Sequence, residues 1–171
     1  ERVLRKHPNV IGVGEIRAAA EAMSVAEASR TGHTCITTIH SNSAASSYRR
    51  MMTLVKRQYD MADAMLMQIM VEAFPIIIYT KQLEDGTRKI MEILEGEEYT
   101  DPLIYRSLYR YDVQDTRRRA NSSEVKIIGR HQKVGQMSDA LVKRFLDNGL
   151  SRREVSRFLK KEDEEPCNGS V

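Results

Sequence analysis

The stretch Val10-Ile-Gly-Val-Gly-Glu-Ile-Arg17 decides how the first half of the chain is expected to fold. Its apolar part, Val10 to Val13, is bounded by proline and glycine, which is typical of a short strand buried on both faces. Glu15 then stands at the carboxyl end of that strand, where open α/β sheets bind ligands. A carboxylate there can orient a water molecule or a hydrated magnesium ion beside a phosphate. The alternative is a strand end with a solvated Glu15–Arg17 pair.

A second segment, Thr31 to Asn42, carries two histidines on either side of another apolar run. The run from Cys35 to Ile39 predicts a strand, which His33 precedes and His40 follows. At ~3.3 Å per residue, an extended segment would separate the two histidines by roughly 20 Å. One metal ion cannot bridge that distance, and no cysteines lie nearby in ligand spacing, so no zinc site is expected at these histidines. His40 is the candidate for contacting a phosphate and His33 for a positional role; two polar residues flanking a strand are the alternative.

The rest of the chain alternates helices and strands and then turns antiparallel. Helices are expected at 18–30, from Ser43 past Val55, at 62–73, at 138–148 and after Ser151, and strands at 76–80, 87–94, 103–111 and 124–130. Asp85-Gly86 is a hairpin signal, and Ser151 with Glu154 has the spacing of a capping box. The class predicted is α/β, with a mostly parallel sheet extended by antiparallel hairpins and C-terminal helices.

A cluster of methionines and a cluster of arginines each have a structural interpretation that requires no binding partner. Met65 and Met70 share a helical stripe with Leu66 and Ile69, so we expect them in the core and not on a partner-binding face. Arg117 to Arg119 is expected in a solvated hairpin loop, with nucleic-acid contact as the less favoured alternative.

Length and composition restrict the class of protein. The 171 residues suffice for one ordinary domain, and 41% apolar with 30% charged residues is typical of a folded globular chain. The net charge of +3 is too small to indicate a nucleic-acid or membrane partner. No apolar run approaches the roughly 18–20 residues of a membrane span. The two cysteines form neither a disulfide framework nor a metal quartet, which suits a reducing compartment.

Two motifs together carry a family resemblance. Gly-Glu-Ile-Arg at 14–17 and Thr-Thr-Ile-His-Ser-Asn-Ser at 37–43 resemble the Walker B and histidine-box pair of type II and type IV secretion and pilus-assembly ATPases. The chain is most similar to the tight-adherence pilus and conjugation branch. Asp-Gly-Thr-Arg at 85–88, followed by Ile-Met-Glu-Ile at 90–93, also resembles the pattern of that branch. The likeness covers roughly residues 4–94, and more faintly 99–149.

The resemblance implies a RecA-like ATPase domain that assembles into a hexameric ring, works with an inner-membrane pilus or secretion platform, and is cytoplasmic at the inner face of the membrane. ATP and Mg²⁺ are then expected in the full-length protein. By position, Glu15 would orient the attacking water, His40 would sense the γ-phosphate, His33 would be its partner in the box, and Arg17 would match the arginine that follows the acid. Residues 1–97 would be the C-terminal portion of the ATPase domain, 98–160 a strand and helix extension, and 161–171 a flexible tail.

The sequence departs from the family at one important motif. No G-x-x-x-x-G-K-[ST] phosphate loop occurs among the 171 residues, so the lysine that holds the β- and γ-phosphates is not among them. Because the chain also starts at Glu1 and not at methionine, we expect a piece of a longer protein that does not hydrolyse ATP alone. The alternatives are a non-catalytic scaffold or interaction remnant of such an ATPase, or a nucleic-acid-binding module.

Overall fold

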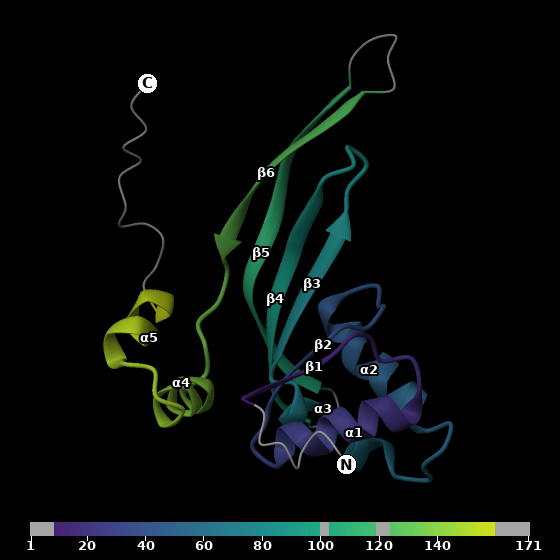
Figure 1. Cartoon of the computed structure of the whole chain (residues 1–171). Helices are drawn as coiled ribbons and strands as arrows, with labels where there is room; N and C mark the ends of the chain where they lie inside the picture. Colours follow the sequence, from purple (N-terminus) through teal and green to yellow (C-terminus); the bar gives the residue numbers. More distant parts are fainter. Residues whose placement is uncertain (1–8, 100–102, 119–123, 160–171) are drawn as a thin grey trace. The chain divides into compact units, whose positions relative to one another are not determined.

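The computed structural model describes residues 9–99, 103–118 and 124–159 (Figure 1). The chain divides into two compact units, residues 1–77 with 96–105, and residues 78–95 with 106–171. Residues 78–95, which the sequence analysis assigned to the portion 1–97, are thus grouped with the later part of the chain. The domain boundaries expected from the sequence, at 97 and at 160, stay predictions.

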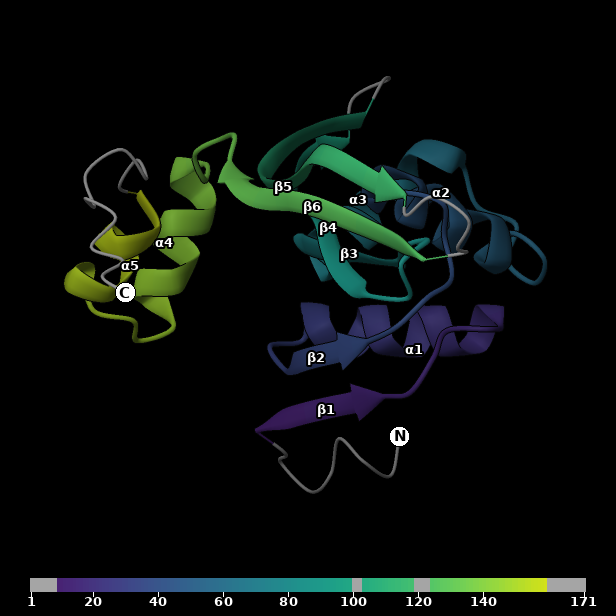
Figure 2. The same ribbon diagram turned by 90° about the horizontal axis from the view of Figure 1, so that it is seen from above.

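The first unit contains a pair of parallel strands. Strand β1 (Val10–Val13) runs alongside β2 (Thr34–Thr37), with the first residue of each strand opposite that of the other and the last opposite the last. Helix α1 (Ala19–Arg30) connects them and packs against β2 (Figure 2). Since the strands are parallel and in register, the segments that follow Val13 and Thr37 leave the pair at the same edge.

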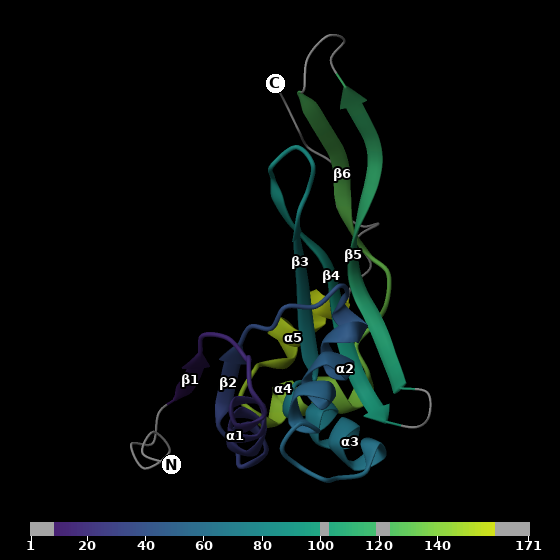
Figure 3. The ribbon, with the colours of Figure 1, turned by 90° about the vertical axis from the view of Figure 1, so that its right-hand side faces the viewer.

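Three helices form the core of the first unit. Helices α1, α2 (Ala44–Val55) and α3 (Asp63–Ala73) pack against one another (Figure 3). Between α1 and α3, the Ser29 hydroxyl donates to the carbonyl of Ala73 at 2.7 Å. The largest fully buried side chains of this unit are Tyr48, Leu54, Val55, Leu66 and Met70. Burial of this apolar surface, at about 25 cal/mol per Å², is the main stabilising term for the unit.

The prediction that Met65 and Met70 lie in the core is only partly confirmed. Met70 is buried as expected, together with Leu66 and Ile69, but the Met65 side chain is 58% exposed. Met67 is buried in its place, at 4% exposure. The buried face of α3, against which α1 and α2 both pack, therefore includes Met67 in place of Met65.

An antiparallel sheet supplies most of the second unit, and the ends of its strands at 76–77, 96–99 and 103–105 belong to the first unit. Strands β3 (Ile76–Gln82), β4 (Arg88–Tyr99), β5 (Leu103–Arg118) and β6 (Val125–Lys133) lie in the order β3-β4-β5-β6. Strand β5 pairs with β6 in antiparallel register, and the pairing has a bulge between Val113 and Asp115. The expectation of a mostly parallel sheet is therefore met only by β1 and β2 among the described residues. The small parallel pair and the larger sheet are separate sheets.

Strand β5 corrects the interpretation of the arginine cluster. Arg117 and Arg118 belong to the strand and not to a loop, while Arg119 lies outside the described residues. Arg117 Nε donates to Asp115 at 2.8 Å, and Arg118 donates to both carboxylate oxygens of Glu84 at 2.8 Å. These two charges are consequently already paired.

Two short helices complete the second unit, and the sequence predicted both of their starts. Helix α4 (Asp139–Asp147) begins after Ser138, whose hydroxyl accepts from the Leu141 amide at 3.1 Å. The Ser138 amide and hydroxyl also donate to the buried carboxylate of Glu95. Helix α5 (Arg152–Leu159) follows the predicted capping box, in which the Ser151 amide donates to Glu154 at 2.8 Å and the Glu154 amide donates back at 3.2 Å.

In residues 9–99, 103–118 and 124–159, no helix has both the length and the apolar character needed to cross a membrane.

Candidate functional site

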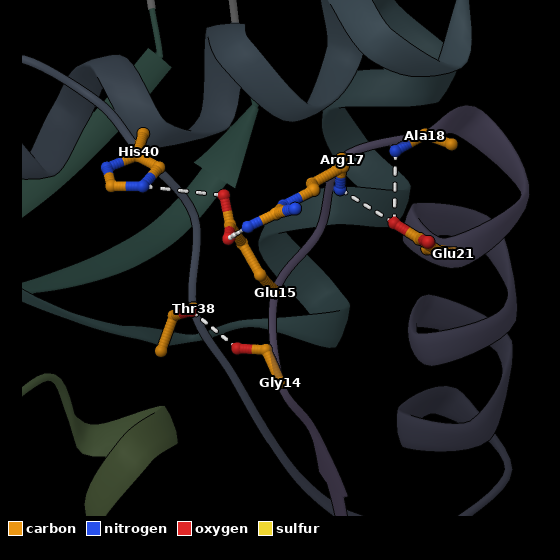
Figure 4. A network of polar contacts seen from close by, with 7 residues as sticks. All are labelled: Gly14, Glu15, Arg17, Ala18, Glu21, Thr38 and His40. Atoms are coloured by element: carbon orange, nitrogen blue, oxygen red, sulfur yellow. Dashed lines mark hydrogen bonds and ion pairs between the residues drawn. The ribbon is translucent and has the colours of Figure 1, made fainter.

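The candidate site lies at the edge where β1 and β2 end. Beyond the strands, the Ile16 amide donates to the Thr38 carbonyl at 2.8 Å, and the Thr38 hydroxyl donates to the Gly14 carbonyl at 2.5 Å (Figure 4). Ile16 is only 2% exposed, so its side chain anchors this segment in the core. The segments that follow β1 and β2 are thereby held side by side for several residues past the sheet. This is the edge at which open parallel sheets bind ligands.

Three of the four predicted site residues meet at this edge. Arg17 donates to Glu15 Oε2 from Nε at 2.8 Å and from Nη2 at 2.6 Å. His40 Nε2 lies 3.5 Å from Glu15 Oε1, so each carboxylate oxygen faces a different basic side chain (Figure 4). The Glu15 side chain is 22% exposed, whereas those of Arg17 and His40 are 76% and 92% exposed. The acid is thus the sheltered member, and the two bases are open to solvent.

The start of α1 fixes the backbone on the other side of Arg17. The Glu21 carboxylate accepts from the backbone amides of Arg17 at 2.7 Å and of Ala18 at 3.1 Å. Glu21 therefore satisfies amide groups that the first helical turn leaves without an intrahelical partner. These two hydrogen bonds lower the pKa of the Glu21 carboxyl, so it stays ionised.

Hydrogen bonds and neighbouring charges also determine the ionisation of Glu15 and Arg17. The hydrogen bond from Arg17 is the largest cause of a lowered pKa at Glu15, and the charges of Arg17 and His40 lower it further. In turn, Glu15 raises the pKa of Arg17. At neutral pH the site therefore holds an ionised carboxylate and a permanent cation. An ionised carboxylate with a lowered pKa is a good hydrogen-bond acceptor and a weak proton acceptor, so it suits holding a water molecule in place.

His33 is not at this edge. It precedes β2 while His40 follows it, so the strand separates them. The His33 amide donates to the Ala28 carbonyl at 3.1 Å, where α1 has just ended and Gly32 has a positive φ of 97°. His33 Nδ1 is buried without a hydrogen-bond partner. Its pairing with His40 in one box stays a prediction.

The donor atoms at this edge bear on whether it suits a metal ion or a phosphate group. In the described part of the chain, no group of three or more His, Cys, Asp or Glu residues is placed to hold a metal ion. Glu15 Oε2 is moreover already engaged by two donors from Arg17. A phosphate group fits better, because Arg17 and His40 both carry exposed nitrogen donors at the edge.

Sequence reasoning missed two contributors to this geometry. Thr38 joins the segments that follow β1 and β2 through its hydroxyl and its carbonyl, and Glu21 fixes the backbone of Arg17. A signal for Glu21 was present, because an acid three residues after the start of a helix is typical of a capping box. No local pattern identified Thr38, since its partner lies 24 residues away.

The site therefore defines an α/β protein segment with an acid, an arginine and a histidine at the ligand-binding edge of parallel strands. Residues 1–75, which include all of these side chains, match the family model described as Type II/IV secretion system protein. This part of the chain is therefore similar to type II/IV secretion system proteins, and the relatives below carry the same similarity.

Several curated proteins are similar to parts of the chain. An uncharacterised protein of Methanocaldococcus jannaschii is 30% identical over 116 residues, which cover 66% of this chain and 40% of that protein. The protein transport protein HofB homolog of Haemophilus influenzae is 38% identical over 66 residues, covering 39% and 14%. The conjugal transfer protein TrbB of Rhizobium radiobacter is 33% identical over 97 residues, covering 56% and 28%. The chain thus spans well under half the length of each of these relatives.

Proposed function

We propose that the chain is the C-terminal portion of a hexameric motor ATPase that hydrolyses ATP to drive pilus assembly, secretion or conjugative transfer. The observation that carries the proposal is the convergence of Glu15, Arg17 and His40 at the carboxyl edge of β1 and β2. They lie within the segment that matches the secretion family, whose relatives are named for transport, pilus assembly and conjugal transfer. The tight-adherence and conjugation branch is part of this proposal.

Each side chain has a role that its surroundings favour. Glu15 is the acid that orients the attacking water, because it is ionised and sheltered. His40 contacts the phosphate, because its ring is exposed and lies next to the acid. Arg17 supplies a permanent cation at the same edge. The buried side chain of Ile16 anchors the segment, which keeps these groups together before any ligand arrives.

The phosphate loop belongs to the proposal as well. Since residues 1–171 contain no G-x-x-x-x-G-K-[ST] motif, we assign the loop that holds ATP and Mg²⁺ to sequence outside them. The 171-residue chain alone would then not hydrolyse ATP. The complete protein would work as a ring in the cytoplasm, at the inner face of the membrane, together with an inner-membrane platform.

The two paired arginines of β5 do not favour the nucleic-acid alternative. Arg117 and Arg118 face Asp115 and Glu84, so binding a phosphate backbone would first require breaking two ion pairs. The scaffold alternative differs from the motor in one measurable way: it predicts no turnover even when the upstream sequence is present.

The test is an ATPase assay on the protein encoded by the extended upstream reading frame, compared with the 171-residue chain. Glu15→Gln should retain nucleotide binding and lose turnover by at least about 100-fold, the scale of losing a positioned catalytic group. Glu27→Gln, which removes an exposed acid elsewhere on α1, is the matched control and should keep the parental rate. Parental turnover in Glu15→Gln would refute the site, and turnover by the 171-residue chain that Glu15→Gln abolishes would refute its proposed inactivity.

A further inference from the structure

Arg17 holds Glu15 by only one of its two carboxylate oxygens. Both of its hydrogen bonds end on Oε2, while Oε1 faces His40 Nε2 at 3.5 Å, which is too long for a good hydrogen bond. We propose that Arg17 is a positioning residue for Glu15. When a polyphosphate anion reaches the edge, the Arg17 guanidinium releases the Glu15 carboxylate and binds the anion in its place. The inference rests on the proposed function in identifying that anion as the phosphate chain of a nucleotide.

The geometry allows the exchange without movement of the backbone. The Arg17 amide is held by Glu21 at 2.7 Å, and the preceding residue, Ile16, is both buried and bonded to Thr38. The Arg17 side chain, by contrast, is 76% exposed. The guanidinium can therefore turn from one partner to another by side-chain rotation alone.

Electrostatics favours the anion over the carboxylate. Arg17 lies between two acids, Glu15 and Glu21, which both raise its pKa and keep it charged. An exposed ion pair of this kind is weak. A polyphosphate carries several negative charges against one on Glu15, and its oxygens match the guanidinium fork. His40, exposed on the other side of the acid, can donate a ring N–H to the same anion.

The exchange changes what Glu15 can do. While Arg17 is bound, Oε2 is occupied by two donors; once Arg17 turns away, both carboxylate oxygens can accept a hydrogen bond from water. The charged groups that face Glu15 are Arg17, His40 and, more distantly, Glu21. Because the Arg17 hydrogen bond is the largest cause of its lowered pKa, the pKa of Glu15 should rise when Arg17 leaves.

The experiment is an NMR titration of the 171-residue chain, with ¹³C detection of the Glu15 carboxyl and ¹⁵N detection of arginine Nε, in the absence of Mg²⁺. Sodium tripolyphosphate is the probe. It should shift the Arg17 Nε signal and raise the pKa of Glu15. Arg17→Gln should raise that pKa without the probe and abolish the response to it, while Arg17→Lys should restore part of both. Arg30→Gln removes another exposed, paired arginine, which donates to Glu72 at 2.9 Å, and should change neither.

Three results would overturn the inference: an unchanged Glu15 titration in Arg17→Gln, a Glu15 pKa that does not respond to tripolyphosphate in the parent chain, or equal responses of Arg17 and Arg30, which indicate nonspecific anion binding. These readouts need no turnover. Failure of the proposed function would be seen separately, as parental ATPase activity in Glu15→Gln of the longer protein.

Discussion

The contact between Gly96 and Tyr48 in the first unit makes a sharp prediction about stability. Tyr48 is fully buried, and its hydroxyl donates to the Phe74 carbonyl at 2.5 Å. The Gly96 amide is held by the Pro75 carbonyl at 2.9 Å. A Cβ atom added at Gly96 would lie against the Tyr48 hydroxyl and 2.9 Å from its ring carbon Cζ. Gly96→Ala must therefore displace a ring that is closely packed in the core.

The magnitude follows from the two effects involved. Forcing a methyl group into a close-packed core costs about 1–3 kcal/mol of the free energy of unfolding, and the hydrogen bond to Phe74 is at risk as well. Tyr48→Phe removes that bond and leaves a buried carbonyl with one partner fewer, which costs about 1–2 kcal/mol. In the double variant the hydroxyl is absent, so the closest collision disappears. The combined loss should then be smaller than the sum of the single losses by at least about 0.5 kcal/mol.

Urea unfolding of the four proteins, followed by far-ultraviolet circular dichroism, measures this coupling. Additive losses would show that the methyl group does not meet the hydroxyl. A Gly96→Ala protein as stable as the parent would refute the packing argument altogether. In either case Gly96 would be an ordinary strand residue and not one that the core requires.

Two further predictions concern the second unit. Hydrogen bonds from Thr87 and from the Ile127 amide lower the pKa of Asp85, so its contribution to stability is present above the ordinary aspartate pKa of about 3.9 and is lost as pH falls through the lower, folded value. Asp85→Asn should flatten the dependence of urea midpoints on pH below about 5, and an unchanged slope would contradict this. Ser138→Ala removes both the cap of α4 and a donor to the buried Glu95 carboxylate, so it should cost at least about 1 kcal/mol in thermal unfolding. Asp139→Asn, at the exposed position that follows the cap, is the control and should cost less; equal losses would show that the Ser138 hydroxyl does not stabilise the helix start.

Local signals predicted the ends of several elements correctly. The helices expected at 18–30 and 138–148 end before Gly32 and Gly149, which both have a positive φ, and Gly86 has a φ of 78° in the expected hairpin turn. The capping pair of Ser151 and Glu154 forms as its spacing indicated. Each of these features depends on residues no more than a few positions apart, so a single sequence contains the necessary information.

Long-range features were harder to predict. Whether Met65 or Met67 is buried depends on where neighbouring helices lie, and both residues are equally apolar. The extension of β5 to Arg118 depends on pairing with β6, which polar residues such as Asp115 and Arg117 do not signal. At the site, Glu15 and His40 were each placed after a strand, but their 3.5 Å approach follows from the parallel register of β1 and β2. Such register is a tertiary property.

The parallel pair has one further consequence, for local dynamics. The expectation of strands buried on both faces is wrong for this pair: Val10 and Ile36 are 51% and 64% exposed, and the alternate residues are only half-buried. Within the described residues each strand pairs only with the other. Parallel strands normally draw their protection from cover on both faces and from neighbours on both edges. The amides of this pair should open to solvent more readily than those of the three packed helices. The edge that carries Glu15, Arg17 and His40 therefore lies on strands with one exposed face, so any layer that covers β1 and β2 would also stiffen these three side chains.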